Sequence, residues 1–157
     1  MRDFQLQNCL TEEFESIHDI ASDVKALMLV LTAGWCSACR SYIPQVINYN
    51  RPFAESDLKT MFILGEDASS GQPSLQYCRT YASSYGEDGG RFYIDHDGDY
   101  GFMTTFQHIW PYLGPNGEFG LPWKGVLSGG MSNYIYEYGD GATSSNDPTS
   151  AIQRLTQ

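Results

Sequence analysis

Two cysteines, Cys36 and Cys39, are separated by two residues and follow an apolar run that ends at Gly34. A helical pattern begins immediately after them. A cysteine at a helix N-terminus lies near unpaired backbone N–H groups and the positive end of the helix dipole, and both favour the reactive thiolate. A second cysteine three residues later lies one turn along the helix, where it can attack a mixed disulfide formed by the first. The spacing predicts thiol–disulfide exchange, with Cys36 as nucleophile and Cys39 as resolving thiol.

Metal binding is the main alternative for this pair. A Cys-x-x-Cys segment can supply half of a zinc site, which then needs two further ligands at comparable spacing. Neither Cys9 nor Cys78 has a Cys or His close to it in the sequence, and His18, His96 and His108 are scattered. The sequence therefore favours a redox pair, and we expect no metal site and surface positions for the histidines.

The acidic turn from Asp95 to Asp99 resembles a calcium-binding loop in composition. An EF-hand loop starting at Asp95 would need glycine at its sixth position and glutamate at its twelfth. Tyr100 and Phe106 occupy those positions. We interpret the segment as a carboxylate-rich turn that ends a strand.

Composition limits the classes of partner. The chain has 157 residues, and we expect a single domain over residues 1–157. Its 9 Lys and Arg against 19 Asp and Glu give a formal net charge of −10, which argues against nucleic acid and anionic membranes as partners. No apolar run approaches the length of a membrane span, and no signal peptide is recognisable. Any export signal or lipid anchor is therefore expected outside this chain.

Hydrophobic periodicity predicts alternating strands and helices. The continuous apolar run from Leu27 to Thr32 is typical of a central strand buried on both faces. Apolar residues recur at helical spacing from Cys36 to Asn50, and Pro44 is expected to kink that helix. The other predicted strands lie at 4–6, 58–64, 92–94, 126–127 and 134–136, and the other predicted helices within 12–24, at 75–85, at 102–113 and after Asp147-Pro148. This order predicts a three-layer α/β sandwich with a mixed central sheet.

The segment Trp35-Cys36-Ser37-Ala38-Cys39, at a strand-to-helix junction, resembles the thioredoxin active site. Pro44 stands five residues after Cys39, like the helix-kinking proline of that superfamily, and Gly120-Leu121-Pro122 resembles its Gly-x-Pro segment with a cis-proline. Residues 4–8, and the long separation between the cysteines and Pro122, resemble the TlpA-like and peroxiredoxin-like branches. The resemblance spans essentially the whole chain and implies a thioredoxin-like fold with an extra N-terminal strand.

The resemblance implies a TlpA-like thiol–disulfide oxidoreductase. Trp35, Leu121, Pro122 and Trp123 would shape a shallow apolar groove for extended polypeptide, and the Leu121–Pro122 bond would be cis. The dithiol is itself the redox group, so no cofactor is expected. The implied partners are disulfide- or dithiol-containing proteins and an upstream electron donor, with the chain acting as a monomer.

Three features depart from the thioredoxin pattern. Val30 replaces a buried aspartate that assists proton transfer to the second thiol, so another group or water must serve here. Ser37 and Ala38 replace the glycine and proline that lie between the cysteines and tune the redox potential. The bulky Trp123 follows Pro122, where the superfamily usually has a small residue.

TlpA-like proteins typically reduce selected partners outside the cytoplasm, so the resemblance implies an extracytoplasmic reductase, periplasmic or membrane-tethered. A thiolate at a helix start also stabilises the reduced form, which leaves the direction of electron flow open. Cys9 and Cys78 either form a structural disulfide, which implies an oxidising compartment, or remain buried free thiols. The alternative to an enzyme is a redox-inert thioredoxin-fold module that binds a metal ion or a protein partner.

Overall fold

A computed structural model describes residues 1–95, 102–109, 113, 120–129, 134–138 and 148–157. Its strands are β1 (Gln5–Asn8), β2 (Phe14–Ser16), β3 (Ala26–Ala33), β4 (Leu58–Glu66), β5 (Phe92–Ile94), β6 (Trp123–Ser128) and β7 (Tyr134–Tyr138). Its helices are α1 (Ile17–Ser22), α2 (Ser37–Asn50), α3 (Leu75–Ser83), α4 (Met103–Ile109) and α5 (Pro148–Thr156). No helix within the described ranges is long and apolar enough to cross a membrane.

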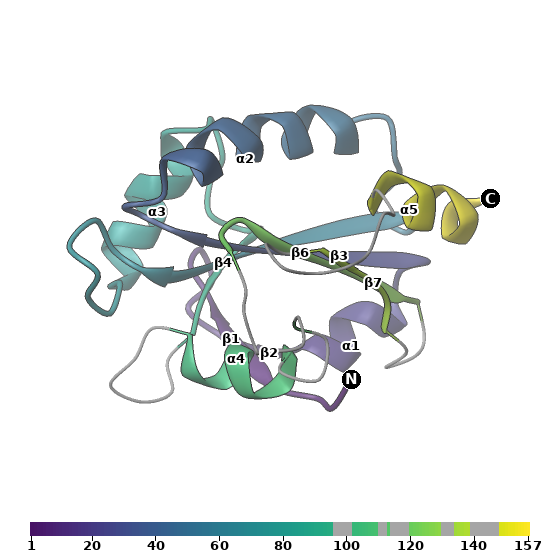
Figure 1. Cartoon of the computed structure of the whole chain (residues 1–157), viewed down its shortest axis with the longest axis horizontal. Helices are drawn as coiled ribbons and strands as arrows, with labels where there is room; N and C mark the ends of the chain where they lie inside the picture. The colour runs from purple at the N-terminus through teal and green to yellow at the C-terminus, as the bar shows by residue number, and fades with distance from the viewer. Residues whose placement is uncertain (96–101, 110–112, 114–119, 130–133, 139–147) are drawn as a thin grey trace.

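The strands form one mixed sheet in the order β2-β1-β5-β4-β3-β6-β7. Strands β3, β4 and β5 are parallel to one another, whereas β1, β2, β6 and β7 pair with their neighbours in antiparallel fashion. Figure 1 shows helices α2, α3 and α5 on one face of this sheet and α1 and α4 on the other. The predicted three-layer α/β sandwich with a mixed sheet and an extra N-terminal strand is therefore confirmed.

Strand β3 lies in the middle of the sheet, between β4 and β6, and all eight of its residues are buried. Leu27, Leu29 and Leu31 pack into the core under α1 and α4. Met28 and Val30 pack on the opposite face, in the core under α2, α3 and α5. Each fully buried leucine contributes about 2 kcal/mol from removal of apolar surface from water. Because both faces are covered, the strand has no polar alternation, as its apolar run predicts.

The segment from residue 12 to residue 24 departs from the helix predicted there. It contains the short strand β2 and then the six-residue helix α1. The Asn8 side-chain oxygen accepts the backbone N–H groups of Leu10 and Thr11, and the chain turns so that β2 pairs with β1. The Ser16 hydroxyl then accepts the backbone N–H of Asp19 and caps α1. These side-chain contacts divide one predicted element into two.

Other predicted features lie partly beyond the described residues. The acidic turn is described only at Asp95, which directly follows β5. Residues 110–112 of the helix predicted at 102–113, and Asp147 before the last helix, fall outside the described residues. The central helices, the strand at 92–94 and the C-terminal hairpin agree with prediction within a few residues. Helix α3 begins at Leu75, as predicted, because the hydroxyl of Ser74 accepts the backbone N–H of Tyr77 and forms the cap.

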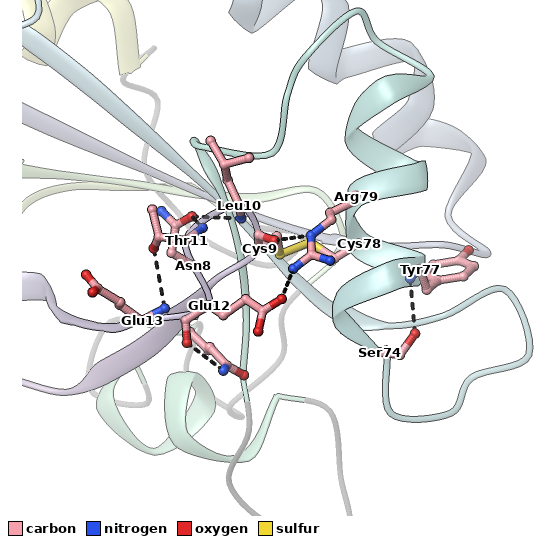
Figure 2. Close-up of polar contacts among 11 residues, drawn as sticks. Asn8, Cys9, Leu10, Thr11, Glu12, Glu13, Ser74, Tyr77, Cys78 and Arg79 are labelled. Atoms are coloured by element: carbon pink, nitrogen blue, oxygen red, sulfur yellow. Dashed lines mark hydrogen bonds and ion pairs between the residues drawn. A yellow bond between two sulfur atoms is a disulfide. The ribbon is translucent and has the colours of Figure 1, made fainter.

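A disulfide joins Cys9, just after β1, to Cys78 on α3, with Cα atoms 6.1 Å apart. Both cysteines are fully buried. Figure 2 shows that Arg79 reinforces this link, since its Nε donates to the Cys9 carbonyl oxygen at 2.7 Å and its Nη2 pairs with the Glu12 carboxylate. Of the two possibilities left by the sequence, the structural disulfide is confirmed.

Candidate active site

The turn between β3 and α2 places Cys36 at the N-cap of α2. Its backbone is extended, and its N–H donates to the Ala33 carbonyl oxygen at 3.1 Å. Its Sγ accepts the backbone N–H of Cys39 at 3.1 Å, in the way that a serine hydroxyl or aspartate carboxylate usually caps a helix. A sulfur held there, when reduced, is stabilised as a thiolate by this N–H and by the helix dipole. The cap geometry therefore supports Cys36 as the attacking thiol.

Cys39 lies one turn into α2 and is bonded to Cys36, with Cα atoms 5.3 Å apart. The structure thus contains the oxidised form of the pair. Cys39 is fully buried and Cys36 is 4% exposed, so Cys36 is the less buried of the two residues. This ordering fits the predicted roles, because an incoming substrate would reach the less buried cysteine first and the fully buried one could resolve the resulting mixed disulfide.

Gly34 sets the path of the chain into this turn. A Cβ atom there would lie 2.2 Å from the Tyr77 hydroxyl oxygen and 2.7 Å from the Ala68 nitrogen. The Gly34 N–H donates to the Glu66 carbonyl oxygen at 2.8 Å, and its carbonyl accepts from Arg40 Nη2 at 3.1 Å. Burial raises the pKa of Tyr77, whose hydroxyl also accepts the Ala68 N–H. Only glycine fits here without displacing neighbouring backbone.

Trp35 lies at the surface beside Cys36, with 46% of the residue exposed. Its Nε1 donates to Oε2 of Glu66, at the end of β4, at 2.6 Å. This hydrogen bond to a carboxylate holds the indole in one orientation on an otherwise exposed side chain. An oriented, exposed aromatic ring next to the reactive sulfur is suited to contact a polypeptide.

The Leu121–Pro122 peptide bond is cis, as predicted. Leu121 packs against the cluster of Ala33, Cys36 and Cys39. Trp123 begins β6 opposite Leu31 of β3, and it is only 1% exposed. A side chain buried in the core cannot line a surface groove directly, so Trp123 can influence one only by fixing the backbone of Pro122.

Phe102 was not singled out by the sequence. Its ring packs against the same cluster of Ala33, Cys36 and Cys39, from the face of the sheet that carries α4. It stands just before α4, within the helix that the sequence predicts at 102–113. No local pattern identifies such a residue, because its contact with the cysteines depends on how distant elements pack.

The histidines lie away from the cysteine pair where they are described. His18 Nε2 lies 3.0 Å from the Met1 carbonyl oxygen, and His108 stacks on Phe4. His96 lies outside the described residues. Among the residues placed by the structure, no three His, Cys, Asp or Glu side chains come together as metal ligands would.

A surface concavity of about 1050 Å³ does not coincide with the cysteines. It lies where β4 and β5 begin, whereas the cysteines follow the carboxyl end of β3, and Asn50, Lys59 and Arg91 are among its lining residues. No cysteine lines it. The candidate active site, at the sheet edge where β3 and β4 end, is therefore assigned by its chemistry rather than by the size of a cavity.

Comparisons with known proteins test the fold. No protein-family model matches the sequence, and no curated protein matches it. A thiol:disulfide interchange protein of the thioredoxin family from Chlorobium tepidum TLS superposes with a TM-score of 0.65 at 18% identity, covering 99% of this chain and 94% of that chain. The exposed lipoprotein thioredoxin of Streptococcus pneumoniae gives 0.62 at 16% identity, covering 98% and 100%.

A third structure, the thioredoxin domain of a thiol-disulfide oxidoreductase from Bacteroides vulgatus, gives a TM-score of 0.66 at 9% identity, covering 99% of this chain and 94% of that chain. All three superpositions span nearly the full length of this chain. At such low sequence identities the superpositions establish the fold, and the activity has to be argued from the site. The chain has the thioredoxin-like fold, with a Cys-x-x-Cys pair at the start of α2.

Proposed function

We propose that this protein is a thiol–disulfide oxidoreductase that exchanges its Cys36–Cys39 pair with disulfides in partner proteins. One observation carries the proposal: the Cys36 sulfur forms the N-cap of α2 and accepts the Cys39 N–H, while Cys39 lies fully buried one turn further on. This arrangement separates an accessible, thiolate-favouring sulfur from a protected one. The similarity in fold to thiol-disulfide oxidoreductases supports the proposal.

In the reductive direction the cycle starts from the dithiol. The Cys36 thiolate attacks one sulfur of the substrate disulfide, a mixed disulfide forms, and the other substrate sulfur leaves as a thiolate that takes up a proton. The Cys39 thiol then loses its proton and attacks the Cys36 sulfur, which releases the second substrate thiolate. Two electrons have moved from the protein to the substrate, and an upstream dithiol donor must reduce the Cys36–Cys39 disulfide before the next cycle.

The proposed substrate surface consists of Trp35, Leu121 and Pro122 around Cys36. Trp35 supplies an exposed ring oriented by Glu66, and Leu121 supplies an apolar contact beside the cysteines. Pro122 precedes the residue that pairs with Leu31, so it lies level with the end of β3. Trp123 supports this surface from within the core. A shallow surface of this kind suits an extended segment of polypeptide better than a small enclosed ligand.

We place this activity in an extracytoplasmic, TlpA-like setting, with the chain acting as a monomer on selected disulfide- or dithiol-containing proteins. The buried Cys9–Cys78 disulfide supports an oxidising compartment, because such bonds are rare where cellular thiols are kept reduced. One protein of similar fold is described as an exposed lipoprotein. The net charge of −10 argues against nucleic acid as a partner.

Two isosteric variants test the proposal on a peptide disulfide substrate. Cys36→Ser should abolish exchange, because the attacking sulfur is lost, whereas Cys39→Ser should accumulate a mixed disulfide on Cys36 that mass spectrometry can locate. The two variants serve as controls for each other, since each removes one sulfur of the same pair. Trapping on Cys39, or release of a bound metal by a chelator without any exchange activity, would reject the proposal in favour of a different role.

A further inference from the structure

We infer that Phe102 shields the resolving thiol Cys39 from solvent and so keeps the two thiols of the reduced pair unequal in reactivity. This inference rests on the proposed function and names a positioning residue for the same site. It adds a part of the site that lies on α4, on the other side of the sheet from α2. Three structural observations support it.

The first observation is the location of the ring. Phe102 and Leu121 are the two partly buried side chains that pack against the cluster of Ala33, Cys36 and Cys39 in the described part of the chain. Cys39 is fully buried in that cluster. Phe102 also packs into the core beneath α1 and α4, so its ring bridges the main core and the cysteine pair.

The second observation is a seat for the ring on β4. A Cβ atom on Gly65 would lie 2.2–2.3 Å from three ring carbons of Phe102, so the ring rests directly on the glycine backbone. The pairing of β3 with β4 runs from Thr32–Leu64 to Ala33–Glu66, which leaves Gly65 as the extra residue of a bulge. A glycine at this bulge provides the space that the ring occupies beside the cysteines.

The third observation is the anchoring of α4, which begins directly after Phe102. The Thr105 N–H donates to Oδ2 of Asp95 at 2.7 Å, so a fully buried carboxylate at the end of β5 caps the first turn of α4. Gln72 Nε2 donates to the Asp95 carbonyl oxygen at 2.6 Å. The Phe102 carbonyl accepts the Phe106 N–H at 2.7 Å and so belongs to the same turn. The position of the ring is thus fixed by both β4 and β5.

The chemical consequence concerns Cys39 in the reduced protein. Burial in an apolar environment disfavours a charged thiolate relative to a neutral thiol. Cys36 has the N-cap interactions that favour its thiolate, whereas Cys39 is fully buried in a cluster against which an aromatic ring and a leucine pack. Removal of the ring would admit water to Cys39 and increase its thiolate fraction at neutral pH.

The test measures the reactivity of Cys39 alone, in a Cys36→Ser background with the Cys9–Cys78 disulfide intact. The rate of alkylation by iodoacetamide is followed by mass spectrometry as a function of pH. Phe102→Ala should increase the rate at pH 7 about tenfold, the equivalent of lowering the pH midpoint by about one unit. Phe102→Leu, which keeps an apolar side chain but loses the ring, should give an intermediate rate. If the alanine variant fails to fold, the alkylation rate of the leucine variant serves as the test.

Phe53→Ala is the matched control, because Phe53 is another partly buried phenylalanine that packs against the core near Tyr49. It should leave the rate and pH midpoint of Cys39 unchanged even if it lowers stability. Rates that are the same with Phe102, with leucine and with alanine would overturn the inference. Disulfide exchange by the unmutated protein is assayed separately. If the unmutated protein shows no exchange, the proposed function is rejected. If the Phe102 variants leave the alkylation rate of Cys39 unchanged, only the role of Phe102 is rejected.

Discussion

At the scale of single residues, Glu66 orients Trp35, an exposed aromatic side chain next to Cys36. We predict that Glu66→Ala lowers kcat/KM for a peptide disulfide about fivefold, the equivalent of about 1 kcal/mol, because Trp35 loses its hydrogen-bond acceptor. Glu66→Gln, which keeps a side-chain carbonyl oxygen, should stay within about twofold of the unmutated protein. Steady-state kinetics check both variants, and full activity of the alanine variant would contradict an orienting role.

The residues proposed to react, Cys36 and Cys39, could be singled out from local sequence. A strand-length apolar run, two cysteines and a helical pattern occur in direct succession, so the chemistry of Cys36 and Cys39 needs no knowledge of distant contacts. Phe102 and Gly65 could not be predicted in this way. Their contact joins β4 to the start of α4, and it exists only because a glycine bulge and a packed helix meet in the folded chain.

At the scale of elements, Tyr93 ties β5 to the edge strand β2. Its buried hydroxyl donates to Oε2 of Glu15 at 2.7 Å, across the intervening strand β1. Burial, together with this hydrogen bond to Glu15, raises the pKa of Tyr93 well above its usual value of 10.0. The N-terminal hairpin is thus attached to the parallel strands partly through a phenol that must remain neutral.

This attachment predicts a loss of stability in alkali. Above pH 10 the unfolded chain loses the phenol proton whereas the folded protein retains it, so the folded state binds more protons and its stability falls as pH rises further. Tyr93→Phe should cost about 1 kcal/mol at pH 7 through the lost hydrogen bond, and it should make unfolding less dependent on pH above 10. Urea unfolding at pH 7 and pH 11 measures both effects. An unchanged pH dependence in the variant would contradict this role.

Elements with long periodic patterns could be predicted, and short ones could not. The patterns of β3 and α2 run over eight and fourteen residues, so strand and helix periods are distinct. Strand β2 has three residues and α1 has six, and their boundary depends on the Ser16 cap. Segments this short contain too few apolar side chains to distinguish the strand period from the helix period. The sequence therefore predicted a single helical segment there.

At the scale of the whole molecule, the Cys9–Cys78 disulfide joins residues 69 positions apart and fastens the N-terminal hairpin to α3. Closing a loop of this length restricts the unfolded chain, and the chain-entropy treatment gives a stabilisation of about 4 kcal/mol. We predict that the double substitution Cys9→Ala, Cys78→Ala lowers the free energy of unfolding by about 2–5 kcal/mol, as measured in urea.

The matched comparison is Cys36→Ser with Cys39→Ser, which opens a bond between residues only three positions apart. It should change the free energy of unfolding far less, because so short a loop hardly restricts the unfolded chain. Equal losses in both double variants would show that the long disulfide does not stabilise the fold through chain restriction. That Cys9 and Cys78 are bonded, rather than two buried free thiols, required the structure, because the sequence leaves both possibilities open.

The most direct test of the central claim is a redox titration of the unmutated protein in glutathione buffers, quenched by alkylation and read by peptide mass spectrometry. We predict that Cys36 and Cys39 gain alkyl groups together, as one two-electron couple, while Cys9 and Cys78 stay bonded. A midpoint near roughly −270 mV indicates a reductase, and one near roughly −120 mV indicates an oxidant. The account is contradicted if Cys36 and Cys39 fail to titrate as a pair, or if Cys9 and Cys78 are the ones that do.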